Sequence, residues 1–304
     1  METINQKQWN FLEKTEKNNS LVSVYLFCGP SKIGKNTMAF DFVRKINNLE
    51  EKTNIEDGAN PDVIVVAPKT EEKAKKKRKK DISIEQVKEA IKSVGYYPYK
   101  AKYKVLIIKE ADRMTASAAN SLLKIMEEPT SDTIIILVSD NDLRLLSTIR
   151  SRCQIIRFGL ASKAVISKQL QYENVEFEEE ELEEVVEFSQ GKIVKAREFL
   201  TNPDKLKLTK DNLKNFRSAL KKGVLEGFML SDELANDKEQ LRESLEEITW
   251  YLRELIKKQI DIGADMRVAN KISLIIEKLI KLRKELLTSN VNQRLQLENF
   301  FVQL

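Results

Sequence analysis

Short apolar runs alternate with amphipathic segments over the first half of the chain, from about residue 23 to residue 158. The runs are nearly continuous in Val, Ile and Leu, as expected for strands that are buried on both faces of a parallel sheet. They cover Val24–Cys28, Asp62–Ala67, Lys104–Lys109, Thr133–Val138 and Gln154–Phe158. Between them lie segments with helical features, including a capping box that starts at Ser83 and a helix stop at Pro129. The alternation predicts an α/β domain with a five-stranded parallel sheet and flanking helices.

Strand-like runs cease after Phe158, and the rest of the chain has the periodicity of helices. Three short segments predict a small helical domain: Lys163–Tyr172, Glu178–Gln190 and Ile193–Leu200. Beyond Pro203, apolar residues form single stripes at 241–256 and 272–286, a pattern typical of an all-α bundle. The predicted domains are therefore residues 1–160, 161–204 and 205–304.

The composition is that of a folded protein, since 41% of the 304 residues are hydrophobic and 33% are charged. No apolar run is long enough to cross a bilayer, and the N-terminus lacks the pattern of a signal peptide. We therefore expect a cytoplasmic protein without a membrane partner. Two cysteines and no histidine leave no basis for a thiolate zinc site or for imidazole catalysis, so we expect no bound metal.

Much of the net charge of +5 lies in the run Lys73–Lys80, within the segment Glu71–Lys80 that has almost no apolar residue. A solvated, mobile loop is the favoured interpretation. Contact with a nucleic-acid backbone is the alternative, although the sequence places no aromatic residue nearby for base stacking.

The segment Gly29–Lys35 has the spacing of a phosphate-binding loop, in which backbone N–H groups and a lysine hold phosphate oxygens. It lies between a predicted strand and a predicted helix, as this function requires. The next residue is Asn36, where a hydroxyl residue would bind Mg²⁺. Farther on, Lys109 ends the strand at which a metal-binding carboxylate would be expected. Because phosphoryl transfer depends on a metal, the two departures predict a nucleotide or anion site without hydrolysis.

The carboxylate of Glu110 follows Lys109 at the end of this predicted strand. Without a metal, we expect it to pair with Lys109 or Lys35. Whether the loop binds nucleotide or another anion such as phosphate is left open by the sequence.

Three further motifs are more distinctive: Ala111–Met114, Ala118–Pro129 and Thr148–Gln154. Together they closely resemble the AAA+ clamp-loader ATPases, with their "LLK-x-x-EEP" and "Ser-Arg-Cys" signatures. Weaker similarity extends to Asn60–Asp62, Tyr97–Lys104 and Asn290–Glu298. Within the family, the chain is most similar to the delta-prime (δ′) class of bacterial DNA polymerase III, whose own nucleotide site is commonly degenerate.

The resemblance implies an AAA+ module, a small helical lid and a C-terminal helical collar that joins a five-subunit ring. The implied partners are the motor (γ/τ) and clamp-opening (δ) subunits and, through the complex, the sliding clamp and primer-template DNA. ATP would be bound by neighbouring subunits, and this chain would require no cofactor. As part of the DNA polymerase III holoenzyme it would belong to a DNA-directed DNA polymerase, a nucleotidyltransferase, in DNA replication.

The resemblance also implies residue roles. In the family, the arginine of Ser-Arg-Cys reaches the γ-phosphate held by the next subunit, so Arg152 is expected to be a trans arginine finger, supported by Ser151 and Cys153. Such an arginine stabilises charge that develops in the transition state. The degenerate nucleotide or anion site would comprise Gly29, Gly34, Lys35 and Asn36, with Lys195 at the lid's sensing position and Lys109 and Glu110 in support. By the same resemblance, Glu110 has the place of the family's water-activating carboxylate.

Many family members carry a four-cysteine zinc module, but residues 47–60 contain no cysteine, which again predicts no zinc. Two alternatives remain. One is an active AAA+ clamp-loader ATPase of the γ/τ motor type, and the other is a stand-alone nucleic-acid-binding protein that uses Lys73–Lys80.

Overall fold

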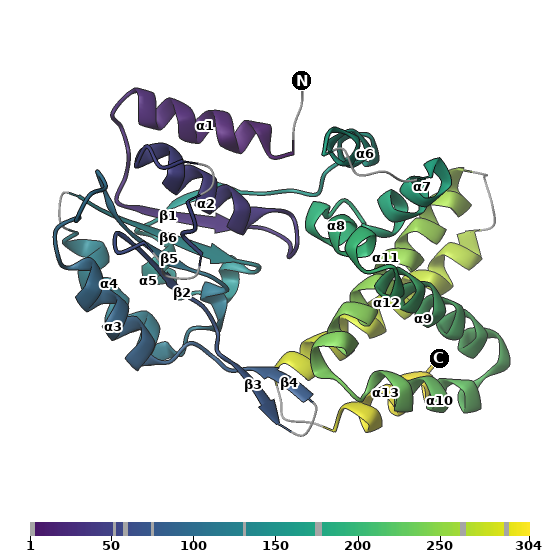
Figure 1. Cartoon of the computed structure of the whole chain (residues 1–304). Coiled ribbons are helices and arrows are strands. Elements are labelled where there is room, and N and C mark those ends of the chain that lie inside the picture. The colour runs from purple at the N-terminus through teal and green to yellow at the C-terminus, as the bar shows by residue number, and fades with distance from the viewer. Residues whose placement is uncertain are drawn as a thin grey trace. The chain divides into compact units, whose positions relative to one another are not determined.

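The computed structural model describes residues 4–50, 53–56, 60–73, 76–129, 132–173, 178–261, 266–288 and 292–304 (Figure 1). The chain forms two compact units, Met1–Arg197 and Glu198–Leu304, and each is described by itself. The division into three domains at residues 160 and 204 stays a prediction. Within the described ranges, none of the helices combines the length and the apolar character that crossing a bilayer requires.

A five-stranded parallel sheet lies at the centre of the first unit, with the strand order β2-β5-β6-β1-β7. The strands are β1 (Val24–Cys28), β2 (Val63–Val66), β5 (Lys104–Ile108), β6 (Thr133–Ser139) and β7 (Gln154–Arg157). All five predicted strands are confirmed. The three inner strands are buried along their whole length, whereas the edge strands β2 and β7 are partly exposed.

Helices cover both faces of this sheet (Figure 1). On one face, α1 (Gln6–Lys17) and α2 (Lys35–Ile46) pack over Tyr25 and Phe27 of β1. The other face is covered by α3 (Ile84–Val94) and α4 (Ala116–Glu127). The predicted capping box at Ser83 is present at the start of α3. Three short helical turns complete the unit's α/β part: η1 (Ala111–Arg113), η2 (Asp142–Arg144) and α5 (Ser147–Arg150).

The basic run forms an antiparallel β-hairpin in place of the predicted loop. Its strands are β3 (Thr70–Lys73) and β4 (Lys76–Lys79), which make a separate two-stranded sheet, while Ala74 and Lys75 lie outside the described residues. The register places Glu71 opposite Arg78 and Glu72 opposite Lys77. In general, opposite charges at facing positions stabilise a strand pair.

The three predicted lid helices are confirmed as α6 (Lys163–Tyr172), α7 (Glu179–Phe188) and α8 (Ile193–Thr201). Between α7 and α8, Gly191 has φ of +77°, and its carbonyl accepts the N–H of Ala161 at 2.9 Å. A Cβ at this glycine would lie 2.7 Å from the Ala161 carbonyl oxygen. The glycine is therefore required where the lid joins the end of the α/β part.

The described residues of the second unit are helical, as predicted. The helices are α9 (Pro203–Lys222), α10 (Val224–Leu234), α11 (Lys238–Asp261), α12 (Met266–Thr288) and α13 (Gln293–Val302). Residues of the predicted stripes are buried, among them Leu245 and Ile248 on α11 and Leu279 and Leu282 on α12. These two helices pack along each other, and α10 packs against both α9 and α13.

Candidate functional site

The phosphate-binding loop lies where the sequence predicts it, between β1 and the start of α2. Gly34 is the N-cap of α2 and has φ of +93°, a conformation that glycine adopts without strain. Gly29 at the other end has φ of +150°, and a Cβ there would lie 2.3 Å from the carbonyl oxygen of Phe158. Both glycines are therefore needed for the loop to turn beside β7. Asn36 is exposed on the first turn of α2.

The ammonium group of Lys35 is held by its own chain. This lysine is only 5% exposed, and its Nζ donates to the carbonyl oxygens of Gly29, at 2.8 Å, and Pro30. A third bond, of 2.9 Å, goes to Oδ1 of Asp140, just beyond the end of β6. An ammonium has three N–H donors, and these three acceptors use all of them. A phosphate that enters the loop must displace at least one of these acceptors.

Asp140 is held in turn by a second carboxylate. Oδ1 of Asp112 accepts the Ser139 hydroxyl at 3.1 Å and the N–H of Asp140 at 3.3 Å, and the Asp112 side chain is 7% exposed. Neither Asp140 nor Asp112 was predicted from the sequence as a site residue. The available signal was their position after two predicted inner strands, since the carboxyl ends of neighbouring parallel strands meet at one edge of a sheet.

Lys109 follows β5 at this same edge of the sheet. It is half-buried, its N–H donates to the Val66 carbonyl at 2.8 Å, and its Nζ lies 5.3 Å from the centroid of the Phe40 ring. An ammonium over an aromatic face is a favourable contact that keeps the cation at the strand end. Within the described residues there is no group of three or more His, Cys, Asp and Glu side chains arranged to hold a metal ion.

Glu110 pairs with a different lysine from those expected. Its Oε1 lies 2.8 Å from Nζ of Lys79, on β4 of the basic hairpin, so the expected pairing with Lys109 or Lys35 is wrong. Glu110 itself has a left-handed backbone, with φ of 49°. This ion pair joins the hairpin to the residue that follows Lys109 after β5.

The lid contacts the loop through main-chain atoms. The N–H of Val194 at the start of α8 donates to the Lys32 carbonyl at 3.0 Å, and the next residue, Lys195, is 6% exposed. On the N-terminal side, the Asn5 side-chain amide donates to the Ile33 carbonyl at 2.9 Å. Lys195 thus lies on α8, as predicted, and directly follows the residue whose N–H bonds to the phosphate-binding loop.

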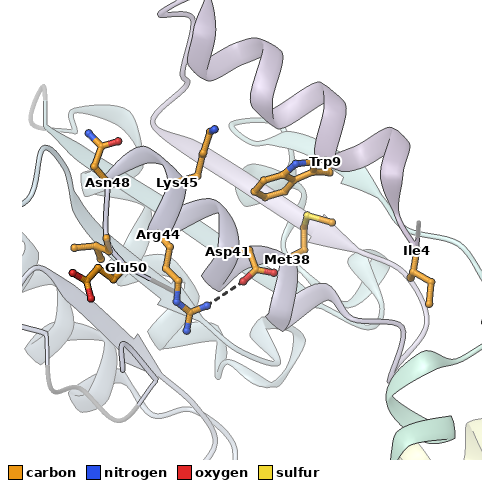
Figure 2. Close-up of a pocket in the computed structure, with 9 residues that line it drawn as sticks. Ile4, Trp9, Met38, Asp41, Arg44, Lys45, Asn48 and Glu50 are labelled. Carbon is orange, nitrogen blue, oxygen red and sulfur yellow. Dashed lines mark hydrogen bonds and ion pairs between the residues drawn. The ribbon is translucent and has the colours of Figure 1, made fainter. Parts of the chain in front are cut away.

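A groove of about 860 Å³ runs between α1 and α2 but does not include the loop. Figure 2 shows Trp9 and Met38 beside it, and Asp41 and Arg44 linked by an ion pair of 3.0 Å. None of the residues predicted for the nucleotide site lines this groove.

Arg152 lies in the turn between α5 and β7 and is exposed. Its Nη1 donates to the Thr148 carbonyl at 3.0 Å, and its Nη2 lies 2.6 Å from Oε1 of Glu127, at the end of α4. Ser151 supports the same turn, because its hydroxyl donates to the Thr148 carbonyl at 3.1 Å. Glu127 is a further residue that the sequence analysis missed. Glu127 belongs to the Ala118–Pro129 motif, but the residue it contacts, Arg152, is 25 positions away in the sequence.

The thiol of Cys153 donates to the Ile149 carbonyl, and burial raises its pKa to about 12. A thiol with so high a pKa is a poor nucleophile at neutral pH. Its role in the turn is therefore packing and a weak hydrogen bond.

Arg152 and the phosphate-binding loop lie at opposite ends of the strands, Arg152 at the amino ends and the loop at the carboxyl ends. In the parallel pair of β1 and β7, Tyr25 faces Gln154 and Cys28 faces Arg157. Arg152 precedes Gln154 and so lies before the amino ends of the strands, whereas Gly29 follows Cys28 at their carboxyl ends. The three residue-to-residue steps from Tyr25 to Cys28 alone rise about 10 Å.

A phosphate-binding loop after an inner strand of a five-stranded parallel sheet, with a helical lid bonded to the loop, defines an AAA+ P-loop module. The family model described as DNA polymerase III, delta subunit matches residues 4–161, just over half of the chain, and the chain belongs to this family of AAA+ clamp-loader proteins.

The chain is also similar to individual proteins. The chain is 35% identical over 168 residues to DNA polymerase III subunit delta' of Bacillus subtilis (strain 168), covering 52% of this chain and 47% of the relative. It is 27% identical over 311 residues to Replication factor C small subunit 1 of Pyrobaculum islandicum, covering 92% and 83%. Among solved structures, it is similar to a DNA polymerase III gamma subunit-related protein from Thermotoga maritima, with 18% identity, a TM-score of 0.45 and coverage of 96% and 97%. The chain spans about half the length of the first delta' relative that it matches.

Proposed function

We propose that this protein is a δ′-like subunit of a bacterial clamp loader that supplies Arg152 to the ATP site of a neighbouring subunit. Its partners would be the γ/τ motor and δ subunits, and the assembly would load a sliding clamp onto primed DNA in the cytoplasm. The chain itself would hydrolyse no ATP, require no cofactor and bind no zinc, while its neighbours bind ATP.

The position of Arg152 carries this proposal. Arg152 and the chain's own loop lie at opposite ends of the strands. The guanidinium of Arg152 is therefore too far from the loop to contact phosphate bound in the same molecule. Arg152 is nevertheless exposed, and its guanidinium donates to the Thr148 carbonyl of its own turn and to the Glu127 carboxylate on α4. A guanidinium binds phosphate oxygens in a planar fork and is always charged, which suits it to a site on another subunit.

Three side chains near the loop support the proposal that this chain does not hydrolyse ATP, because none of them can hold Mg²⁺ as well as the usual ligands do. Asn36 is a weaker Mg²⁺ ligand than a hydroxyl in this position, and the ammonium of Lys109 stands where a carboxylate would hold the metal. A cation there repels Mg²⁺. Lys35, which would bind the β- and γ-phosphates, is engaged by Asp140 and two loop carbonyls.

The deciding experiment compares Arg152→Ala and Arg152→Lys with the unchanged chain in a clamp loader reconstituted with its motor and δ subunits. At the site that Arg152 serves, loss of the finger should lower the rate of hydrolysis by about 10³-fold or more. DNA-stimulated hydrolysis by the whole assembly should fall less, because other sites keep their own arginines. Lysine should rescue poorly, since it has the charge but not the fork.

Arg157→Ala is the matched control, because Arg157 is another exposed, ion-paired arginine, at the opposite end of β7. It should leave hydrolysis unchanged. Equal rates for Arg152→Ala and the unchanged assembly would refute the role in trans.

The phosphate-binding loop keeps its lysine and its contact with the lid. These features favour one alternative, an active ATPase of the γ/τ motor type. The purified chain with Mg²⁺ and ATP distinguishes the two. Turnover above background that disappears in Lys35→Ala would establish the alternative and refute the proposal of an inactive site.

A further inference from the structure

The guanidinium of Arg152 bonds to a carboxylate from a different element of the first unit. Its Nη2 lies 2.6 Å from Oε1 of Glu127, the last residue of α4, while its Nη1 donates to the Thr148 carbonyl at 3.0 Å. These two bonds together require two of the five N–H groups of a guanidinium. The fork can therefore receive phosphate oxygens while Thr148 and Glu127 stay bound.

We propose that Glu127 is a positioning residue, which orients the Arg152 guanidinium for phosphate held by a neighbouring subunit. This role rests on the proposed function, because it concerns how the same arginine is prepared. A long arginine side chain at an exposed position has many rotamers, and binding phosphate costs the entropy of fixing one of them. An arginine that is already held in one conformation loses less entropy when the phosphate arrives.

The hydrophobic core fixes both acceptors in place. Met126, next to Glu127, is 5% exposed, and Ile149, next to Thr148, is fully buried. Both belong to the cluster on the sheet face that α3 and α4 cover. Because core side chains are close-packed, the end of α4 and the α5 turn have a defined separation. The Glu127 carboxylate is thus presented to the turn from a rigid element.

The main chain of the turn is held by its own hydrogen bonds. The N–H of Arg152 donates to the Ile149 carbonyl at 3.1 Å, and the N–H of Ser151 donates to the Ser147 carbonyl at 2.9 Å. These bonds fix the backbone but not the side-chain torsions of Arg152. The bond to Glu127 acts at the far end of those torsions, where the phosphate would bind.

The stability of the fold is a poor explanation for this ion pair. The Glu127 side chain is 51% exposed and that of Arg152 is 36% exposed. Exposed ion pairs add little to the free energy of unfolding, because water screens the charges and ordering two long side chains costs entropy. The pair therefore fixes the place of the guanidinium without adding much to the stability of the domain.

The negative charge of Glu127 leads to a specific kinetic expectation. A carboxylate beside the arginine does not attract the phosphates of ATP, so its removal should not weaken ATP binding to the neighbouring subunit. Its removal should instead lower kcat, because the arginine acts on charge that develops in the transition state. A disrupted subunit interface, by contrast, would raise KM for ATP.

The test measures kcat and KM for DNA-stimulated ATP hydrolysis by the clamp loader reconstituted with its motor and δ subunits. Glu127→Ala should slow the site that Arg152 serves about fivefold, the upper range for an exposed ion pair. The whole assembly should then lose about four-fifths of the rate that Arg152→Ala removes. Glu127→Gln keeps an acceptor oxygen at the same reach and should restore most of the rate. Glu128→Ala, at the next exposed residue, is the matched control and should change neither constant.

Two further measurements separate positioning from misfolding. Thermal denaturation of the isolated chain should be the same for Glu127→Ala and the unchanged protein, since the pair is exposed. In an assembly that already carries Arg152→Ala, Glu127→Ala should cause no additional loss of hydrolysis, because a residue that acts through Arg152 has nothing left to orient.

The outcomes distinguish this role from the proposed function. If Arg152→Ala slows hydrolysis and Glu127→Ala does not, the positioning role is wrong while the proposed function stands. The role is also wrong if Glu127→Ala slows the Arg152→Ala assembly further, if Glu128→Ala loses as much, or if KM rises as kcat falls. Faster hydrolysis with Glu127→Ala would overturn it too, because the carboxylate would then be holding the arginine back. If Arg152→Ala itself has no effect, the proposed function fails and the role of Glu127 fails with it.

Discussion

The ammonium of Lys35 lies 2.9 Å from a carboxylate oxygen of Asp140, so the lysine of the phosphate-binding loop is paired with a carboxylate that follows the neighbouring strand β6. Lys35 is almost fully buried, while the Asp140 side chain is 30% exposed. The pair therefore competes with any anion for the same ammonium and sets how readily the loop accepts phosphate.

Removing the charge of Asp140 should strengthen anion binding. In Asp140→Asn, Lys35 keeps its two carbonyl acceptors but loses its ionic partner, so a fluorescent ATP analogue without Mg²⁺ should bind about fivefold more tightly, or about 1 kcal/mol. Titration of the isolated chain measures this. Asp142→Asn, which removes a nearby carboxylate paired with Arg157, should have no such effect. Weaker binding by Asp140→Asn would show that the carboxylate assists the loop.

We expect Asp62 to make the free energy of unfolding depend on pH in the acidic range. This carboxylate is 1% exposed and accepts the N–H groups of Tyr99, Lys100 and Ala101 at 2.6 to 2.9 Å, with Nζ of Lys104 at 3.3 Å. Burial alone would raise its pKa, but these bonds outweigh burial and hold the pKa below its usual value. Its stabilising contribution is thus complete above the unfolded-state pKa of about 3.9 and is lost as the pH falls toward the lower native pKa.

Asp62→Asn should lower the free energy of unfolding by about 2 to 4 kcal/mol at pH 7, because an amide cannot accept the same set of N–H groups. Urea denaturation from pH 7 to pH 3 should show the difference from the unchanged chain shrinking in acid. Asp81→Asn, at a carboxylate whose side chain is 68% exposed, is the control and should have little effect at any pH. A constant difference across this range would contradict the assignment.

The two cysteines should be inert in the native protein. Burial raises the pKa of Cys153 to about 12, so roughly one thiol in 10⁴ is ionised at pH 8. Burial also raises the pKa of Cys28, although the nearby Arg157 charge opposes the shift. An aromatic disulfide reagent at pH 8 should label neither thiol until urea is added, and then both. Rapid labelling of one native thiol, assigned with Cys28→Ala and Cys153→Ala, would contradict this.

Gly29→Ala should destabilise the loop and the end of β7. The added Cβ would lie 2.3 Å from the Phe158 carbonyl oxygen, and φ of +150° is unfavourable for alanine. Strain and the displaced backbone together should lower the free energy of unfolding by about 2 to 4 kcal/mol. Gly159→Ala is the matched control, since a Cβ there meets no atom within 4 Å. Similar thermal denaturation of the two variants would refute the close approach.

The strands were predictable from the sequence because burial on both faces leaves a continuous apolar run, as in Leu137 and its neighbours on β6. The β3–β4 hairpin was not, because its facing residues, such as Glu71 and Arg78, are charged and give no apolar periodicity. Likewise, the loop of Lys35 was recognisable from local spacing. Its partner Asp140 is 105 residues away, and only the fold brings the two together.

The register that sets Tyr25 beside Gln154 places two different functional surfaces at the two ends of the parallel strands. One end of the strands presents an arginine, and the other presents a phosphate-binding loop. Any assembly in which Arg152 meets a neighbour's bound nucleotide is therefore built head to tail, since each contact uses unlike surfaces. Such a chain of subunits has a direction, and this protein's place in it determines which neighbour it can serve.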